Sequence, residues 1–117
     1  MVICESAIDA ISFSLLFPDG YARYASIGGR TSPIQPKLLR AQMELLAGGS
    51  EIVAATDADD AGRQLADAIR KSFDAAARPD LVFRRQEPVG AKDWNDQLRA
   101  CKAPEVARTK VGTVQPK

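Results

Sequence analysis

The sequence predicts an α/β fold in which about four parallel strands form one sheet flanked by helices on both faces. Four short runs rich in apolar residues, at 1–4, 21–27, 51–56 and 81–85, alternate with longer amphipathic segments. The runs at 1–4 and 51–56 have almost no polar alternation, which is typical of strands that are buried on both faces. Strands that alternate with helices form right-handed β-α-β units, and such units build a parallel sheet.

The length of the chain bounds its domain organisation. With 117 residues, of which 45% are hydrophobic and 26% charged, the chain is long enough for one globular domain. We expect that domain to cover residues 1–101. The segment 102–117 contains two prolines and no hydrophobic periodicity, and we expect it to be a disordered tail. The abrupt start of the first strand suggests a domain cut from a longer polypeptide.

The composition excludes several kinds of chemistry. The chain has no histidine, which excludes Ser-His and Cys-His catalysis, imidazole bases and the usual zinc sites. Its two cysteines form no disulfide framework, so we expect a cytoplasmic protein. No apolar run approaches the ~20 residues that span a bilayer, so we expect no membrane contact. The net charge of +1 gives no basic field for a polyanion, and we expect the isolated domain to be a monomer.

Helix signals separate the predicted strands. A capping box at Ser6 and Asp9 begins the first helix, Ser32 and Pro33 precede the second, and Asp60 is the expected cap of the third. A last short helix opens at 93 and ends near 101. Apolar spacing predicts the sheet-facing residues, namely Ile8, Ile11, Leu15 and Leu16, then Ile34, Leu38, Leu45 and Leu46, then Ala61, Leu65, Ile69 and Phe73.

Acidic side chains follow three of the predicted strands. Glu5 comes directly after the first strand, Asp57 and Asp59 after the third, and Asp93 and Asp96 in the segment after the fourth. Because the loops after parallel strands share one edge of the sheet, we expect these carboxylates to gather there. Oxygen ligands without His or Cys select a hard ion, Mg²⁺ or Mn²⁺. Glu5 is then placed to act as a general acid or base beside the metal.

Each of these residues also has an ordinary structural interpretation. Asp59 or Asp60 can cap the third helix, and Asp93 can cap the last one with Asp96 completing the box. Glu5 can be a first-turn acid that complements the helix dipole, and the glycines 28–29 can be a simple turn. Caps explain each residue singly, but they explain the gathering of acids at three strand ends less well.

The ordered motifs resemble those of Toprim domains, the module shared by bacterial primases, topoisomerases and OLD-family nucleases. The motifs are Ile3-Cys4-Glu5-Ser6-Ala7-Ile8-Asp9, Ser26-Ile27-Gly28-Gly29, Ala55-Thr56-Asp57-Ala58-Asp59-Asp60-Ala61-Gly62 and Lys92-Asp93-Trp94-Asn95-Asp96. The resemblance covers residues 2–98 and implies a compact, Rossmann-like Toprim fold. The last motif is most similar to primase-like Toprim domains of plasmid, phage and mobilisation proteins.

The resemblance implies roles for individual residues. Glu5 matches the family's catalytic glutamate, Asp57 and Asp59 match its metal-binding pair, and Asp93 matches a further metal-binding acid. Asp96 is a possible additional acid beside Asn95. Four residues are candidates for binding substrate or phosphate: Gly28, Gly29, Arg63 and Lys92.

The expected function is therefore Mg²⁺-dependent nucleotidyl or phosphoryl transfer on nucleic acid, as a catalytic part of a DNA primase-like or plasmid mobilisation protein. We expect DNA and nucleotides as partners, held through further domains of the parent protein. One alternative is a non-catalytic Toprim scaffold or DNA-associated interaction module. Another is an OLD-like metal-dependent nuclease. A receiver-like or phosphatase-like domain is less consistent, because a phosphatase Asp-x-Asp pair usually follows the first strand.

Overall fold

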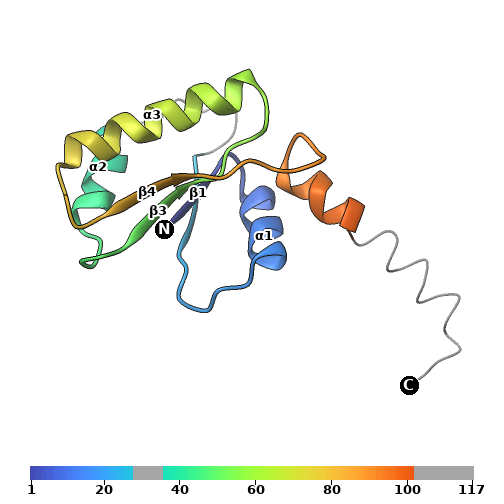
Figure 1. Cartoon of the computed structure of the whole chain (residues 1–117), viewed down its shortest axis with the longest axis horizontal. Helices are drawn as coiled ribbons and strands as arrows, with labels where there is room; N and C mark the ends of the chain where they lie inside the picture. Colours follow the sequence, from blue (N-terminus) through green and yellow to red (C-terminus); the bar gives the residue numbers. More distant parts are fainter. Residues whose placement is uncertain (28–35, 102–117) are drawn as a thin grey trace, which may run out of the picture.

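Strands and helices alternate along the chain in the computed structural model, which describes residues 1–27 and 36–101. The strands are β1 (Val2–Cys4), β2 (Tyr24–Ser26), β3 (Glu51–Ala54) and β4 (Val82–Arg85). The helices are α1 (Ala7–Leu16), α2 (Pro36–Glu44) and α3 (Asp60–Ala76), and residues 94–101 form a further helix. The predicted alternation is confirmed (Figure 1).

The four strands form one parallel sheet in the order β2-β1-β3-β4. Val2 is paired with Tyr24 on one side and with Val53 on the other, so β1 and β3 are the two central strands. The predicted parallel α/β sheet is therefore confirmed. This order places the carboxyl ends of β1 and β3 beside each other, which is where Glu5 and Asp57 leave the sheet.

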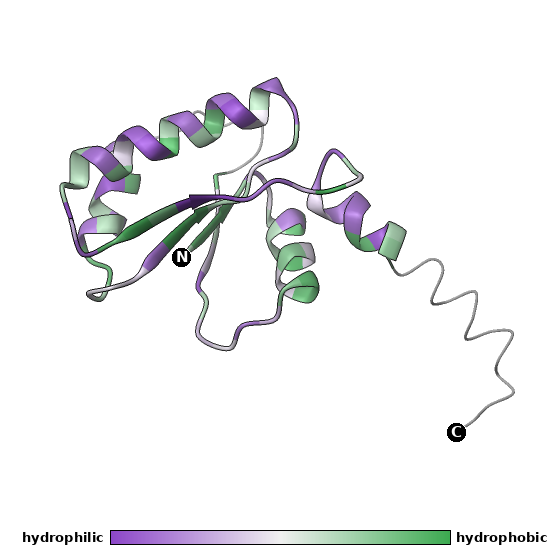
Figure 2. Cartoon of the chain, viewed as in Figure 1, coloured by the Kyte–Doolittle hydropathy of each residue, from purple (hydrophilic) through white to green (hydrophobic). Residues whose placement is uncertain are grey.

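Helices cover both faces of the sheet, and alternate strand residues point into two separate cores. On one face, the buried side chains of β1 and β3 pack against α2 and α3 in a core formed by Ile3, Met43, Ile52, Ala54, Ala66, Ile69, Ala76 and Leu81. On the other face they pack against α1 and the helix 94–101, in a core formed by Val2, Cys4, Ala10, Phe13, Val53, Ala55 and Trp94. Figure 2 shows the central strands as the most apolar part of the chain.

The predicted inward face of α1 is wrong for Ile8, Ile11 and Leu15, whereas Leu16 packs against the core. Ile8, Ile11 and Leu15 are 57%, 60% and 55% exposed, and Leu16 is only partly buried. The buried side of this helix is formed by Asp9, Ala10, Ser12 and Phe13. The reason is the aromatic cluster on this face, in which Phe13 meets the edge of Trp94 with ring centroids 4.9 Å apart. The packing of the Phe13 ring against Trp94 sets the rotation of α1. The aliphatic residues on the other side of the helix, Ile8, Ile11 and Leu15, therefore remain exposed.

The inward face of α2 also differs from the prediction. Met43 is fully buried, and Leu39 and Leu46 pack against the core, whereas Leu38 and Leu45 are exposed. Helix α2 begins at Pro36, and Ile34, Ser32 and Pro33 lie outside the described residues. For α3 the prediction agrees better, since Ile69 is buried and Phe73 packs against the core.

Two further expectations concern the ends of the chain and the membrane. The segment 102–117 lies outside the described residues. Among residues 1–27 and 36–101, no helix combines the length and the hydrophobicity that crossing a membrane requires.

Candidate metal and catalytic site

Glu5 and Asp57 meet at the carboxyl edge of the sheet. The backbone N–H of Asp57 donates a hydrogen bond to Glu5 Oε2 over 2.7 Å. Glu5 is only 6% exposed, although it carries a carboxyl group at the end of a strand. The contact follows from the register of β1 and β3, because Ile3 lies opposite Ala54 and both strands end close to that pair.

The carboxyl group of Asp57 is strongly perturbed by its surroundings. Its Oδ1 atom is buried and has no hydrogen-bond partner among the described residues. Burial, and after it the negative charges of Glu5, Asp9, Asp93 and Asp59, together raise the pKa of Asp57 to about 7. A buried polar atom without a partner costs free energy unless a ligand satisfies it. Asp57 therefore has the environment of a carboxylate that lacks a cation.

Asp59 lies at the start of α3 and caps it. Its Oδ1 accepts a hydrogen bond from the Gly62 N–H over 2.7 Å, and its Oδ2 lies 3.5 Å from Lys92 Nζ. The expectation that Asp60 caps this helix is wrong, because Asp60 already belongs to the first turn. The site acid and the cap are the same residue, which holds Asp59 near Asp57 at the amino end of the helix.

The segment that carries Asp93 is attached to the end of β3. Lys92 O accepts a hydrogen bond from the Ala58 N–H over 2.7 Å, and the fully buried Trp94 donates its indole N–H to Ala55 O over 2.8 Å. Asp93 Oδ1 accepts from the Asp96 N–H over 2.8 Å, so Asp93 opens the helix 94–101. Two segments joined by bonds between residues 34 and 39 positions apart in sequence are thereby brought to one edge.

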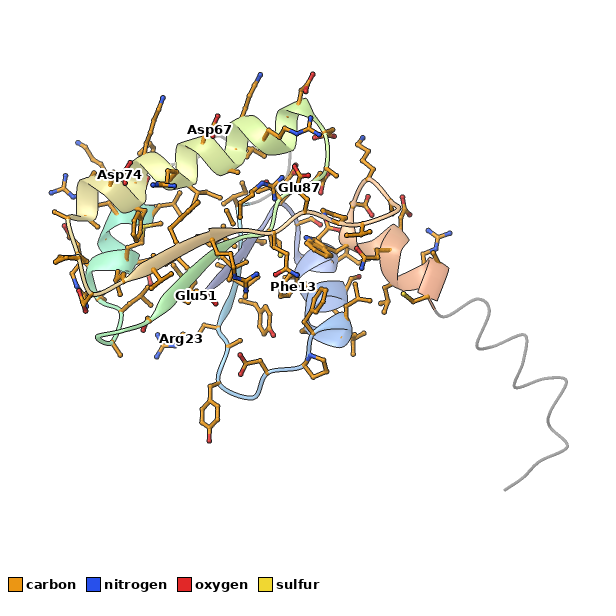
Figure 3. All side chains as sticks on the ribbon, viewed as in Figure 1. Phe13, Arg23, Glu51, Asp67, Asp74 and Glu87 are labelled. Atoms are coloured by element: carbon orange, nitrogen blue, oxygen red, sulfur yellow. The ribbon has the colours of Figure 1, made fainter. Side chains whose placement is uncertain are left out.

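The remaining predicted site residues are exposed or lie outside the described chain. Asp96 is exposed and lies 3.6 Å from an Arg99 nitrogen. Arg63 is exposed and pairs with Asp60 over 3.0 Å and with Glu87 over 3.4 Å. Figure 3 shows Glu87 on the loop after β4, on the side of the sheet that α3 covers. Gly28 and Gly29 lie outside the described residues.

Sequence reasoning missed the role of Asp9 beyond its capping box. Asp9 is 6% exposed, accepts from Ser6 Oγ over 3.0 Å, and accepts from the Asn95 N–H over 3.3 Å. Burial raises its pKa, while these hydrogen bonds lower it. The carboxylate thus joins α1 to the helix that follows Asp93. The only signal in the sequence was that Asp9 lies one helical turn before Phe13. That spacing becomes informative once the structure shows which side of α1 is buried.

Gly62 is a second residue whose role requires the structure. A Cβ atom at this position would lie 2.0 Å from Asp57 O. The first turn of α3 therefore packs directly on the main chain of the turn that carries Asp57, and only glycine permits that approach. The buried Thr56 hydroxyl also donates to Gly62 O, which fastens the same turn from the strand side.

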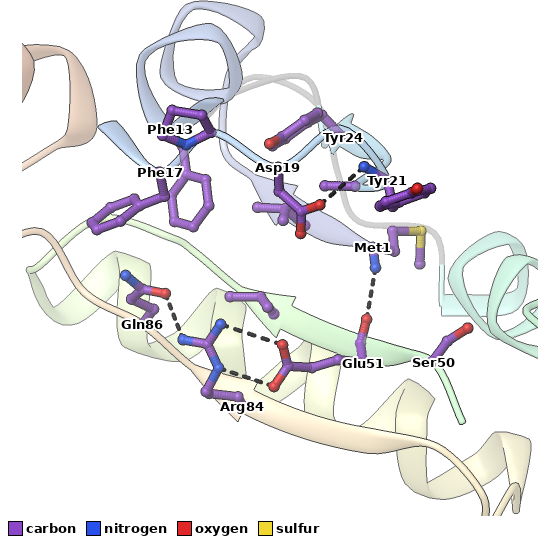
Figure 4. Close-up of a pocket in the computed structure, with 14 residues that line it drawn as sticks. Met1, Phe13, Phe17, Asp19, Tyr21, Tyr24, Ser50, Glu51, Arg84 and Gln86 are labelled. Atoms are coloured by element: carbon purple, nitrogen blue, oxygen red, sulfur yellow. Dashed lines mark hydrogen bonds and ion pairs between the residues drawn. The ribbon is translucent and has the colours of Figure 1, made fainter. Parts of the chain in front are cut away.

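An open cavity lies elsewhere in the described part of the chain. It has a volume of about 600 Å³ and is lined by residues that include Phe13, Phe17, Tyr24, Glu51 and Arg84 (Figure 4). Its other walls include Met1 and Ser50, at the amino ends of β1 and β3. The cavity therefore lies at the opposite ends of the central strands from Glu5 and Asp57, neither of which lines it.

Comparison with known proteins identifies the family. The model of the family described as Toprim-like matches residues 2–98. The chain belongs to the Toprim-like family. Neither the search of curated proteins nor that of solved structures finds a match. Toprim domains as a class bind divalent metals and are associated with nucleic acids, and both properties apply to this domain at that general level.

The donor chemistry of this Toprim domain fits a hard divalent cation. The acids at the edge offer oxygen ligands only, and the unpartnered Asp57 Oδ1 is the atom that a cation would satisfy. Within 1–27 and 36–101, however, no group of three or more Asp, Glu, His or Cys side chains is arranged as a complete metal site. Mg²⁺ is commonly bound by one or two carboxylates together with water and substrate phosphates, so an incomplete protein cage is compatible with it.

Proposed function

We propose that this Toprim domain catalyses Mg²⁺- or Mn²⁺-dependent nucleotidyl or phosphoryl transfer on nucleic acid, within a DNA primase-like or plasmid mobilisation protein. The observation that carries the proposal is the buried, unpartnered carboxylate oxygen of Asp57, next to Glu5 at the carboxyl edge of the sheet. Ligands of open α/β sheets bind at this edge.

We assign the metal-holding role to Asp57, with Asp59 and Asp93 as the further acids of the site. The negative charges of Asp59 and Asp93 both raise the pKa of Asp57, so each of these two groups lies within electrostatic range of Asp57. When bound, the cation supplies positive charge to the transferring phosphate. Lys92, 3.5 Å from Asp59, is the basic side chain that we assign to a substrate phosphate.

We assign the role of general acid or base to Glu5. Its Oε2 atom accepts the hydrogen bond from the Asp57 N–H, which orients the carboxyl group. The Oε1 atom takes no part in that bond. A proton-transfer group needs a defined position close to the reacting oxygen. Because Glu5 is fixed to the same turn as Asp57, proton transfer and metal binding occur side by side.

Binding of the nucleic acid is assigned to other parts of the parent protein. The net charge of the chain is +1, and many of its arginines are paired with acids, among them Arg63, Arg70, Arg84 and Arg85. Affinity for a polyanion depends on basic residues that neutralise phosphates. This charge balance favours a catalytic module over an independent nucleic-acid-binding domain.

The first test is a Mg²⁺ titration of the ¹⁵N-labelled chain followed by NMR. We expect saturable shifts at the amides of Glu5, Asp57, Asp59 and Asp93, and none at Asp67 on the exposed side of α3. Substituting Asp57→Asn should remove the response, whereas Asp67→Asn should not. A wild-type chain without saturable shifts at millimolar Mg²⁺ would count against the metal site.

The second test separates catalysis from a scaffold role. The scaffold role is favoured by the lack of a complete metal cage within the described residues, 1–27 and 36–101. We propose Glu5→Gln in the full-length parent protein, with Asp67→Asn as the matched carboxyl-to-amide control. Loss of primer synthesis or of strand cleavage, with nucleic-acid binding retained, supports catalysis. Unchanged activity supports a non-catalytic scaffold. The product formed by the wild type, new strand or cleaved strand, distinguishes a primase from an OLD-like nuclease.

A further inference from the structure

Arg85, the last residue of β4, spans the turn that carries Asp57. Its Nη1 atom donates to Ala54 O and Thr56 O, each over 3.1 Å, and to Gln86 O over 2.8 Å. Its Nη2 atom donates to Asp57 O over 3.0 Å and to Glu87 Oε2 over 3.1 Å. One guanidinium thus contacts three carbonyls along 54–57, where the chain leaves β3 for the acidic edge.

The contacts to Thr56 O and Asp57 O replace the hydrogen bonds that a sheet would provide. The ladder of β3 and β4 ends at the pair Ala54 and Arg85, so the carbonyls of Thr56 and Asp57 lie beyond it. Buried main-chain carbonyls need partners, and Thr56 is fully buried. Only arginine offers a planar fork of donors wide enough to bond several carbonyls at once.

The position of Arg85 also matters for charge. Its side chain is 23% exposed, and burial lowers its pKa, while Glu87, Glu5 and Asp57 act in the opposite direction. The cation is therefore within electrostatic range of both site acids. Its donors contact the main chain of Asp57 and leave the Oδ1 atom of that residue without a hydrogen-bond partner.

We propose that Arg85 is a positioning residue of the metal site, whose guanidinium holds the main chain of Thr56 and Asp57 in the turn that presents the Asp57 carboxylate beside Glu5. The inference rests on the proposed function of the same edge, and it adds a residue from the neighbouring strand. Positioning by a rigid neighbour is what a site needs to bind its ligand without first reorganising.

The variant that tests the inference is Arg85→Lys, because it keeps the charge and the aliphatic stem but loses the fork. The matched control is Arg84→Lys on the same strand, since Arg84 contacts side chains on the opposite face, those of Glu51 and Gln86. Both variants are compared with wild type by thermal melting, by metal-free amide hydrogen exchange and by Mg²⁺ titration.

In the metal-free chain, we expect Arg85→Lys to speed exchange of the Asp57 and Ala58 amides about tenfold relative to the Val53 amide in β3. We expect its Mg²⁺ affinity to fall about fivefold or more, and that of Arg84→Lys to stay within about twofold of wild type. A melting temperature that falls with unchanged exchange at Asp57 and unchanged Mg²⁺ affinity would overturn the inference.

The remaining outcomes are also decisive. An Arg85→Lys chain that fails to fold would overturn the inference, because it would show that the residue supports the whole fold and not one turn. If the wild type binds no Mg²⁺, the proposed function fails. Exchange at Asp57 then still decides whether Arg85 holds the turn.

Discussion

Asp57 carries a carboxyl group whose surroundings disfavour its negative charge. One oxygen of its carboxylate is buried and lacks a partner among the described residues, and burial and the acids around it raise its pKa. Functional sites commonly keep such groups at the expense of stability. The Oδ1 atom of Asp57, whose burial without a partner destabilises the metal-free fold, is also the atom that a cation would contact.

The raised pKa of Asp57 predicts that the stability of the metal-free chain depends on pH. Because the pKa of Asp57 is raised from 3.8 to about 7, the folded state holds its proton more tightly than the unfolded state. The contribution of this group to stability is therefore lost as pH rises from about 4 through about 7. We expect Asp57→Asn to melt above wild type at pH 8, by roughly 3 °C or more, and by less at pH 5.

The control for that comparison is Asp67→Asn, which changes an exposed carboxyl group on α3. It should leave the melting temperature unchanged at both values of pH. An Asp57→Asn chain that gains nothing at pH 8 would show that the carboxylate already has a partner.

A second residue-scale prediction concerns Gly62. The Cβ of Gly62→Ala would meet Asp57 O at 2.0 Å, so the turn or the helix start must move. Although alanine is the better helix former by about 1 kcal/mol, we expect a net loss of about 2 kcal/mol in the free energy of unfolding. Urea unfolding measures this change. Gly20→Ala, where nothing lies within 4 Å of the added Cβ, should be nearly neutral.

At the scale of elements, the aromatic cluster organises the face of the sheet opposite α3. Trp94 is fully buried, and Phe13 and Phe17 both meet it edge-on, with ring centroids 4.9 and 5.8 Å apart. This packing joins α1 to the helix 94–101. It therefore places Asp93 beside the end of β3 and turns Ile8, Ile11 and Leu15 outward.

The rotation of α1 can be tested by two substitutions. Ile11→Gln changes an exposed side chain and should alter the free energy of unfolding by less than about 0.5 kcal/mol. Phe13→Ala removes a buried ring and should cost about 3 kcal/mol or more. Chemical denaturation of both variants gives the comparison. Equal losses would indicate that α1 buries both of its sides.

At the scale of the whole molecule, metal binding and folding are linked. A ligand that binds only the folded state stabilises it by RT ln(1 + [L]/Kd), which is about 1.4 kcal/mol at tenfold excess over Kd. We expect Mg²⁺ at this excess to raise the melting temperature of the wild type by several degrees. Asp57→Asn should not respond, so its advantage over wild type at pH 8 should shrink or reverse. Differential scanning fluorimetry with matched ionic strength measures the effect.

The sequence predicted the general arrangement of the fold because its strongest signals are local. Continuous apolar runs indicated the four strands, and the alternation with helices indicated a parallel sheet. Acids placed directly after strands predicted that Glu5 and the Asp57 turn would share an edge, since parallel strands end on one side. The Toprim-like family match over residues 2–98 agrees with the motifs that carried the resemblance.

What only the tertiary structure decided depends on contacts between distant segments. The sheet-facing residues of α1 and α2, the choice of Asp59 over Asp60 as a cap, and the burial of Asp9 are set by packing partners far away in sequence. Arg85 shows the reason most clearly. In the sequence it is one arginine of a pair, and only the pairing of β4 with β3 places its guanidinium over the carbonyls of the Asp57 turn. Periodicity specifies which elements form, whereas side-chain packing between them specifies which atoms meet.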